Sequence, residues 1–135
     1  MSEQIVREIE ELHWFFQQWF RGSLTGSLAF ARVDKALAPE FELIRPSGER
    51  VARAALLSGL RAAQGQRRGA DPPFRIWVED IVPRPLGPGL WQVTYREWQS
   101  GPDAPRGRLA NAVLRETPAA PSGWQWVHVH ETWLP

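Results

Sequence analysis

Two histidines near the C-terminus are the residues of this chain best suited to chemistry at neutral pH. His128 and His130 lie two positions apart in a segment, 124–134, that alternates large rings with other residue types. In a strand, side chains two positions apart point to the same face, with about 7 Å between their Cα atoms. A neutral imidazole can accept a proton from a substrate. We therefore predict that His128 and His130 are catalytic residues on a cavity wall, the alternative being a non-catalytic polar role there or at a subunit interface.

Other polar side chains are expected beside these histidines if neighbouring strands form tight hairpins. A symmetrical turn at 118–123 would place Asn111 opposite His130, and one at 100–107 would place Arg96 beside Asn111. Guanidinium and amide groups suit an anionic or carbonyl-bearing ligand. A polar ladder at a subunit interface is the alternative. For Tyr95 and Glu97, on the opposite face of their strand, we expect a rim or interface position.

The first predicted helix, residues 3–20, supplies further candidate ligand contacts. Apolar residues recur every three or four positions from Ile5 to Trp19, as in an amphipathic helix. Ser2 is a plausible N-cap and Gly22 a plausible end. Its aromatic residues either line a pocket or pack in a core. The predicted ligand-binding residues are His13, Phe16, Trp19, Phe20, Phe41, Leu43, Arg96, Asn111 and Trp126.

The remaining elements follow from hydrophobic periodicity and from proline and glycine positions. Pro39 is expected to end the second helix. After residue 73 the period changes from helical to two, which predicts four long strands joined by turns. The elements are a helix at 27–38, strands at 41–44 and 49–51, a helix at 53–63, and strands at 74–82, 90–99, 108–117 and 124–134.

Composition excludes several classes of protein. The 135 residues predict one domain over residues 1–135. The absence of cysteine excludes disulfides and cysteine-bound zinc. Sixteen basic and fifteen acidic residues give a net charge of +1, with the arginines dispersed, so we expect no nucleic-acid partner. We also expect a cytoplasmic protein with no membrane partner, because no apolar run reaches signal-peptide or spanning length.

Neither a cofactor nor a resident metal is expected. No glycine-rich phosphate loop, serine nucleophile elbow or HExxH helix occurs in the sequence. His128 and His130 would need a third ligand to hold a metal, and His13 is the one histidine that remains.

The element order resembles that of the nuclear transport factor two-like superfamily, and within it the SnoaL-like and related small bacterial domains. The similarity extends over nearly the whole chain. Local features agree with it, namely the aromatic first helix, the first hairpin and the last strand. The matching segments are His13-Trp-Phe-Phe, Phe41-Glu-Leu-Ile-Arg-Pro-Ser-Gly48 and Gly123-Trp-Gln-Trp-Val-His-Val-His130.

The resemblance implies a cone-shaped α+β fold in which three helices pack in a strongly curved antiparallel sheet, in the order ααββαββββ. It implies a cavity for a small organic molecule between the sheet and the first helix, and a homodimer formed through the sheet. Alternatives are a SnoaL-like cyclase, isomerase or dehydratase using histidine acid–base chemistry, and a structural dimerisation module. Arg45 replaces the carboxylate base that ketosteroid isomerase carries before a proline, so that mechanism does not transfer.

Overall fold

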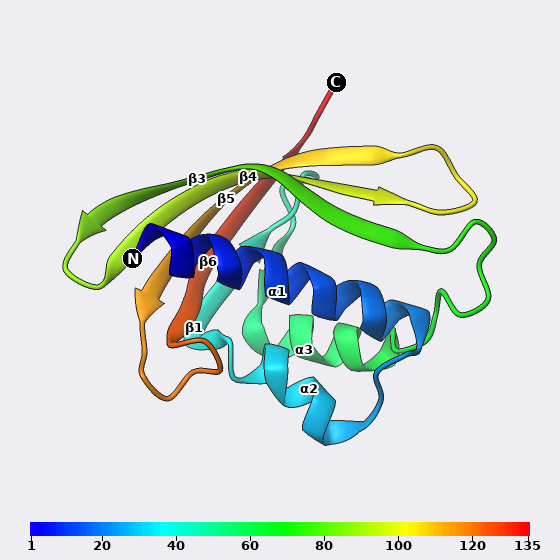
Figure 1. Cartoon of the computed structure of the whole chain (residues 1–135), viewed down its shortest axis with the longest axis horizontal. Coiled ribbons are helices and arrows are strands. Elements are labelled where there is room, and N and C mark those ends of the chain that lie inside the picture. Colours follow the sequence, from blue (N-terminus) through cyan, green and yellow to red (C-terminus); the bar gives the residue numbers. More distant parts are fainter.

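The predicted element order and the curved α+β fold are confirmed by the computed structural model, which describes residues 1–135 (Figure 1). The three helices lie on the concave side of one curved sheet. No helix is both long enough and apolar enough to cross a membrane. The elements are α1 (Ser2–Arg21), α2 (Gly26–Asp34), β1 (Leu37–Ile44), β2 (Arg50–Ala52), α3 (Arg53–Ala62), β3 (Arg75–Gly87), β4 (Leu90–Ser100), β5 (Arg106–Glu116) and β6 (Trp124–Trp133).

The sheet has the strand order β2-β1-β6-β5-β4-β3. All neighbouring strands are antiparallel except β1 and β6, which pair in parallel. This pairing places the last strand of the chain in the middle of the sheet, beside the first hairpin. The sheet arches over α1, whose apolar face packs against the concave side (Figure 1).

Helix α1 forms as its apolar stripe predicts. Ile5, Ile9, Leu12 and Trp19 are buried, and Gly22 ends the helix in the left-handed conformation with φ of 84°. The predicted N-cap is wrong, since Met1 precedes the helix and Ser2 lies in its first turn. Phe15, which does not belong to this stripe, is also buried and stacks on Trp19, because helices α2 and α3 cover a second side of α1.

The second helix is shorter than predicted, and Pro39 does not end it. Helix α2 stops at Asp34, and Pro39 lies within strand β1. The Trp126 amide donates to the Ala36 carbonyl at 2.8 Å, and Leu37 pairs with Trp126 in the sheet. Pairing with β6 therefore overrides the local helical preference. The ladder is irregular between Leu37 and Glu42, where a proline without an N–H is tolerated.

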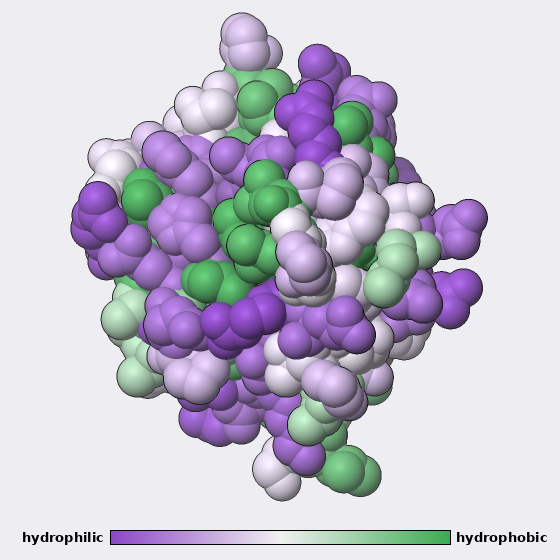
Figure 2. Space-filling view, turned by 90° about the vertical axis from the view of Figure 1, so that its left-hand side faces the viewer, coloured by the Kyte–Doolittle hydropathy of each residue, from purple (hydrophilic) through white to green (hydrophobic).

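Strand β3 runs five residues past the predicted end at Val82, to Gly87, and contains Pro83 and Pro85. It lies at the edge of the sheet, where a proline removes no ladder hydrogen bond. A register shift between Glu79 and Val82, with Asp80 at φ of 53°, bends the strand. Figure 2 shows the face of the molecule at the end that carries the β3–β4 turn. Hydrophobic residues lie near the centre of this face, and most of the residues around them are hydrophilic.

Candidate functional site

A cavity of about 150 Å³ lies between α1 and the concave face of the sheet. Of its 19 lining residues 13 are hydrophobic, so most of its wall suits an apolar ligand surface. Helices α1 and α3 and strands β1 and β3–β6 all contribute side chains. Six of the predicted ligand-binding residues line it, namely His13, Phe16, Phe20, Phe41, Leu43 and Trp126.

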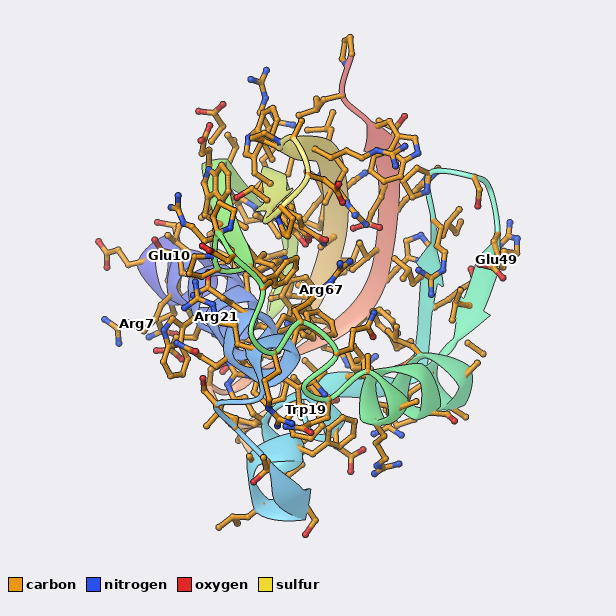
Figure 3. All side chains as sticks on the ribbon, turned by 90° about the vertical axis from the view of Figure 1, so that its right-hand side faces the viewer. Arg7, Glu10, Trp19, Arg21, Glu49 and Arg67 are labelled. Atoms are coloured by element: carbon orange, nitrogen blue, oxygen red, sulfur yellow. The ribbon has the colours of Figure 1, made fainter.

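The other three predicted ligand-binding residues lie outside the cavity. Trp19 packs against Phe30 in the core, and its indole N–H donates to the Leu60 carbonyl at 2.7 Å (Figure 3). Asn111 pairs with His130 as predicted, but Thr94 rather than Arg96 lies opposite Asn111.

Arg96 and Asn111 are directed to the outer face of the sheet. The Arg96 Nε lies 3.6 Å from Asp80 Oδ2, and the Asn111 side-chain oxygen accepts a hydrogen bond from Gln92 at 2.6 Å. Their predicted place at the cavity is therefore wrong, although the two side chains do share one face of the sheet.

The predicted placement of His128 and His130 on the cavity wall is also wrong, and a β-bulge explains why. Val113 pairs with His128, yet the next residue of β5, Leu114, pairs with Trp126, so Val127 is an extra residue in β6. An extra residue reverses the face of every side chain beyond it. Trp126 therefore faces the cavity, while His128 and His130 point away from it.

The bulge brings Val129 and Glu131 to the cavity instead. Glu131 joins His13, Glu97 and Arg108, which come from three other elements, in a polar cluster at one end of the cavity. His13 Nε2 donates to Glu97 Oε1 at 2.9 Å, and Arg108 Nη1 donates to Glu131 Oε1 at 3.2 Å. Gln99 donates to the second Glu97 oxygen at 2.7 Å. Tyr95 and Glu97 thus face the cavity, which corrects the expected rim or interface position.

His13 and Glu97 are held as a charged pair. Burial raises the pKa of Glu97, but hydrogen bonds from His13 and Gln99 and the charges of His13 and Arg108 outweigh it, giving a pKa of about 2. Burial lowers the pKa of His13, but the contact with Glu97 outweighs it, so the His13 pKa is raised. His13 Nδ1 also donates to the Ile9 carbonyl at 2.7 Å. Both ring nitrogens therefore act as donors in the imidazolium form.

The pKa values of Glu131 and Tyr95 are raised, whereas that of Glu97 is lowered. Burial and the negative charge of Glu97 raise the pKa of Glu131, and Arg108 only partly offsets this. Burial also raises the pKa of Tyr95 well above its usual value, so its phenol stays neutral. The Tyr95 ring lies edge-on to His13 at 5.2 Å. The cluster thus offers a ligand a guanidinium group, a neutral phenol and a carboxyl that is easily protonated.

A family model for the C-terminal domain of sucrose-6-phosphate phosphohydrolase matches residues 5–135. The chain belongs to this family. Sucrose-phosphatase 1 of Nicotiana tabacum is 27% identical over 129 residues, which are 94% of this chain and 30% of the tobacco protein. The chain thus spans about a third of the length of the curated relatives it matches.

Solved structures place this sucrose-6-phosphate phosphohydrolase C-terminal domain among NTF2-like folds. An NTF-2-like protein of unknown function from Pseudomonas aeruginosa superimposes with a TM-score of 0.85 at 25% identity, covering 98% of this chain and 99% of that one. The CaMKII hub of S. rosetta superimposes with a TM-score of 0.70 at 16% identity, covering 98% and 95%. The resemblance to the nuclear transport factor two-like superfamily is therefore confirmed at the level of the fold.

No group of three or more histidine, aspartate or glutamate side chains in this domain is arranged to hold a metal ion. The cluster at the cavity is instead a row of alternating charges, in which His13 contacts Glu97 and Arg108 lies between the carboxylates of Glu97 and Glu131. Such an arrangement can orient a polar group of a ligand by hydrogen bonds.

Proposed function

We propose that this domain binds a small organic molecule in the cavity between α1 and the sheet. The observation that carries the proposal is a buried polar cluster at one end of a cavity whose other lining residues are apolar except for Arg45. Such a wall suits a ligand with an apolar body and one or two oxygen atoms. We place the apolar part against Phe16, Phe41 and Leu43, and the oxygen atoms near Arg108 and Tyr95.

Binding accounts for the cluster better than proton transfer does. A buried histidine next to a carboxylate is a common acid–base arrangement. In this domain, however, one His13 nitrogen donates to Ile9 and the other to Glu97, so neither is free to reach a ligand. Glu97 in turn accepts from both His13 and Gln99. An enzyme that transferred protons through His13 or Glu97 would have to break these hydrogen bonds at each turnover.

The cavity volume sets the size of a suitable probe. A protein cavity of about 150 Å³ lined by apolar side chains can hold a benzene molecule. Phenol combines such a ring with one hydroxyl group and carries no charge at neutral pH. Phenol binding therefore tests the cavity without a contribution from attraction between a negative ligand and the arginines near the polar end of the cavity.

We expect phenol to bind saturably, with shifts in the NMR signals of cavity residues such as Trp126. Replacing Leu56, a cavity residue of α3, by phenylalanine adds volume to the wall. The Leu56→Phe variant should bind phenol at least about tenfold more weakly, a loss of ~1.4 kcal/mol. A Leu28→Phe variant is the matched control, since Leu28 is 91% exposed on α2 and should leave the affinity unchanged.

Circular dichroism of both variants would establish that they fold before the titration is read. Absence of saturable phenol binding to the unmodified domain would refute the proposal. An equal affinity in Leu56→Phe and the unmodified domain would also refute it. Native mass spectrometry of freshly purified protein would then report any ligand retained from the cell.

We also propose that two copies of the domain associate through the outer face of the sheet. Leu109 on that face is 40% exposed and pairs with Arg96 and Thr132 on the adjacent strands. A solvent-facing leucine within a broad, mixed sheet surface suits a second copy of the same surface. The hub of S. rosetta, whose fold is similar, is named for its assembly role.

The dimer has a direct test by sedimentation. We expect a dimeric mass for the unmodified domain and a monomeric mass for Leu109→Glu, because the charge would be buried at the centre of the contact. Leu86→Glu is the control, since Leu86 is exposed near the tip of the β3–β4 hairpin and should not change the mass. A monomeric unmodified domain would exclude the dimer.

A further inference from the structure

A second hollow of about 320 Å³ adjoins the cavity, next to the β4–β5 loop, and we call it the vestibule. Its 11 lining residues come from that loop and from parts of the chain around Phe74 and Trp133. Gln99 and Arg108 line both the vestibule and the cavity. The two hollows therefore meet at the polar end of the cavity.

The charged side chains of the vestibule are three arginines, Arg67, Arg106 and Arg108, and one aspartate, Asp103. The guanidinium groups of Arg67 and Arg106 contact rings rather than carboxylates. Arg106 lies 3.5 Å from the centre of the Trp133 ring, and Arg67 lies 5.2 Å from that of Phe74. Stacking on a ring leaves the N–H groups at the edge of a guanidinium free to bind an acceptor.

The arginines are also held in place by the backbone. Arg67 lies in the loop after α3, where its amide donates to the Phe20 carbonyl at 2.8 Å and the Gly65 amide donates to the Trp19 carbonyl at 2.9 Å. These bonds fasten the loop to the end of α1. In Figure 3 Arg67 lies in front of the sheet, whereas Arg7 and Glu10 point away from the molecule on the far side of α1. Less ordering is then needed when a ligand binds.

The Arg108 side chain lines both the cavity and the vestibule. Its Nη1 donates to Glu131, but its Nε is buried without a hydrogen-bond partner and lies 3.7 Å from Glu97 Oε2. Trp133 has a second guanidinium over it, that of Arg108 at 4.8 Å. A buried donor without an acceptor is costly. Because Glu97 and Glu131 lie beside this guanidinium, the unpaired positive charges of the vestibule are those of Arg67 and Arg106.

We propose that the vestibule binds the phosphate group of an organic phosphate ester whose uncharged part enters the cavity, which rests on the proposed function of that cavity. Guanidinium groups bind phosphate through paired N–H donors, and charge-assisted hydrogen bonds of this kind are the strong ones. Arg67 and Arg106, neither of which is paired with a carboxylate, suit the double charge of a phosphate ester better than the single charge of a carboxylate.

The test is a titration of the full chain with inorganic phosphate at low ionic strength, followed by the Trp133 indole and arginine side-chain NMR signals. We expect saturable shifts that weaken as salt is added. The double variant Arg67→Gln/Arg106→Gln should bind phosphate at least tenfold more weakly, because it removes two guanidinium groups that donate charge-assisted hydrogen bonds. Arg84→Gln is the matched control, because Arg84 is an exposed arginine opposite Gln92 on the edge strand.

Each outcome decides a separate point. Absence of phosphate binding, or an equal loss in Arg84→Gln, would overturn the anion site. Acetate binding as tight as phosphate binding would overturn the assignment to phosphate esters. Phosphate binding that survives in Leu56→Phe supports an anion site distinct from the apolar cavity. Phosphate binding without any phenol binding would leave the vestibule as an anion site, but would refute both the cavity proposal and the entry of the uncharged part of the ester into the cavity.

Discussion

Replacing Glu8 by alanine should destabilise the domain by about 3 kcal/mol or more, one of the two largest effects we expect of a single substitution. Glu8 is 0% exposed and lies on the side of α1 that faces the sheet and α2. Both of its oxygens accept hydrogen bonds from Arg32, and one also accepts from the indole of Trp126 at 2.8 Å. The carboxylate thus joins α1, α2 and β6.

The size of the effect comes from what the substitution leaves behind. Arg32 loses its principal charge partner while remaining four-fifths buried, and the Trp126 indole loses its acceptor. Removing one member of a buried ion pair costs several kcal/mol, because the partner charge stays desolvated. Glu8→Gln would keep the shape of the side chain, so comparing it with Glu8→Ala separates the lost charge from the lost packing.

Glu11 provides the matched control, since it lies one turn further along α1 and approaches the same arginine. Its carboxylate is 52% exposed and 3.7 Å from Arg32. Glu11→Ala should therefore cost less than about 1 kcal/mol. Urea unfolding of the variants at pH 7 measures both values. A loss below about 1 kcal/mol for Glu8→Ala would contradict the structural role we assign to Glu8.

Glu8 was visible in the sequence as an anomaly, although its partner was not. It lies between Ile5 and Leu12 on the apolar stripe of α1, where a carboxylate is expected only if it is paired. The helical period therefore predicted the course of α1 and indicates a buried ion pair. Arg32, 24 positions away, could not be named because the pairing depends on how α2 packs.

The candidate site was predictable in part for a similar reason. The periodicity of α1 places His13 and Phe16 on the cavity side, and the resemblance to the nuclear transport factor two-like superfamily implied the cavity itself. The face of each residue beyond Val127 depends on a bulge that no local signal in β6 reveals. Because β6 contains one extra residue, Val129 and Glu131 face the cavity in place of His128 and His130. Glu97 carried a signal, since it continues the alternation of Val93 and Tyr95, two buried residues of β4.

The second large effect concerns the buried charged pair of His13 and Glu97. The pKa of the Glu97 carboxyl falls from 4.5 to about 2 on folding, a change that contributes about 3 kcal/mol of stability above pH 5. Because the folded pKa is the lower one, this contribution is lost as the pH falls from 4.5 toward 2. His13 has a raised pKa, so its contribution is complete below its usual value and is lost as the pH rises through the folded value.

Glu97→Gln should therefore cost about 3 kcal/mol near pH 6 and progressively less on either side. Toward pH 2 the native carboxylate is protonated and resembles the amide. At alkaline pH the native His13 is neutral, so no charged pair remains to be lost. Urea unfolding of both proteins from pH 3 to pH 9 would give this bell-shaped difference. A difference that is constant over this range would show that Glu97 acts by packing and not by charge.

Glu131→Gln is the comparison variant within the same cluster, because folding shifts the Glu131 pKa in the opposite direction to that of Glu97. Burial and the charge of Glu97 raise the Glu131 pKa in the folded domain. The carboxyl therefore ionises more readily in the unfolded chain, so the domain loses stability as the pH rises from the usual pKa of this carboxyl through the folded value. The variant lacks that ionisation, so its stability relative to the unmodified domain should increase with pH, measured in the same unfolding series. Between pH 3 and pH 6 the two variants should therefore show opposite pH trends, because folding lowers the pKa of Glu97 and raises that of Glu131. Parallel trends over this range would contradict the raised pKa of Glu131.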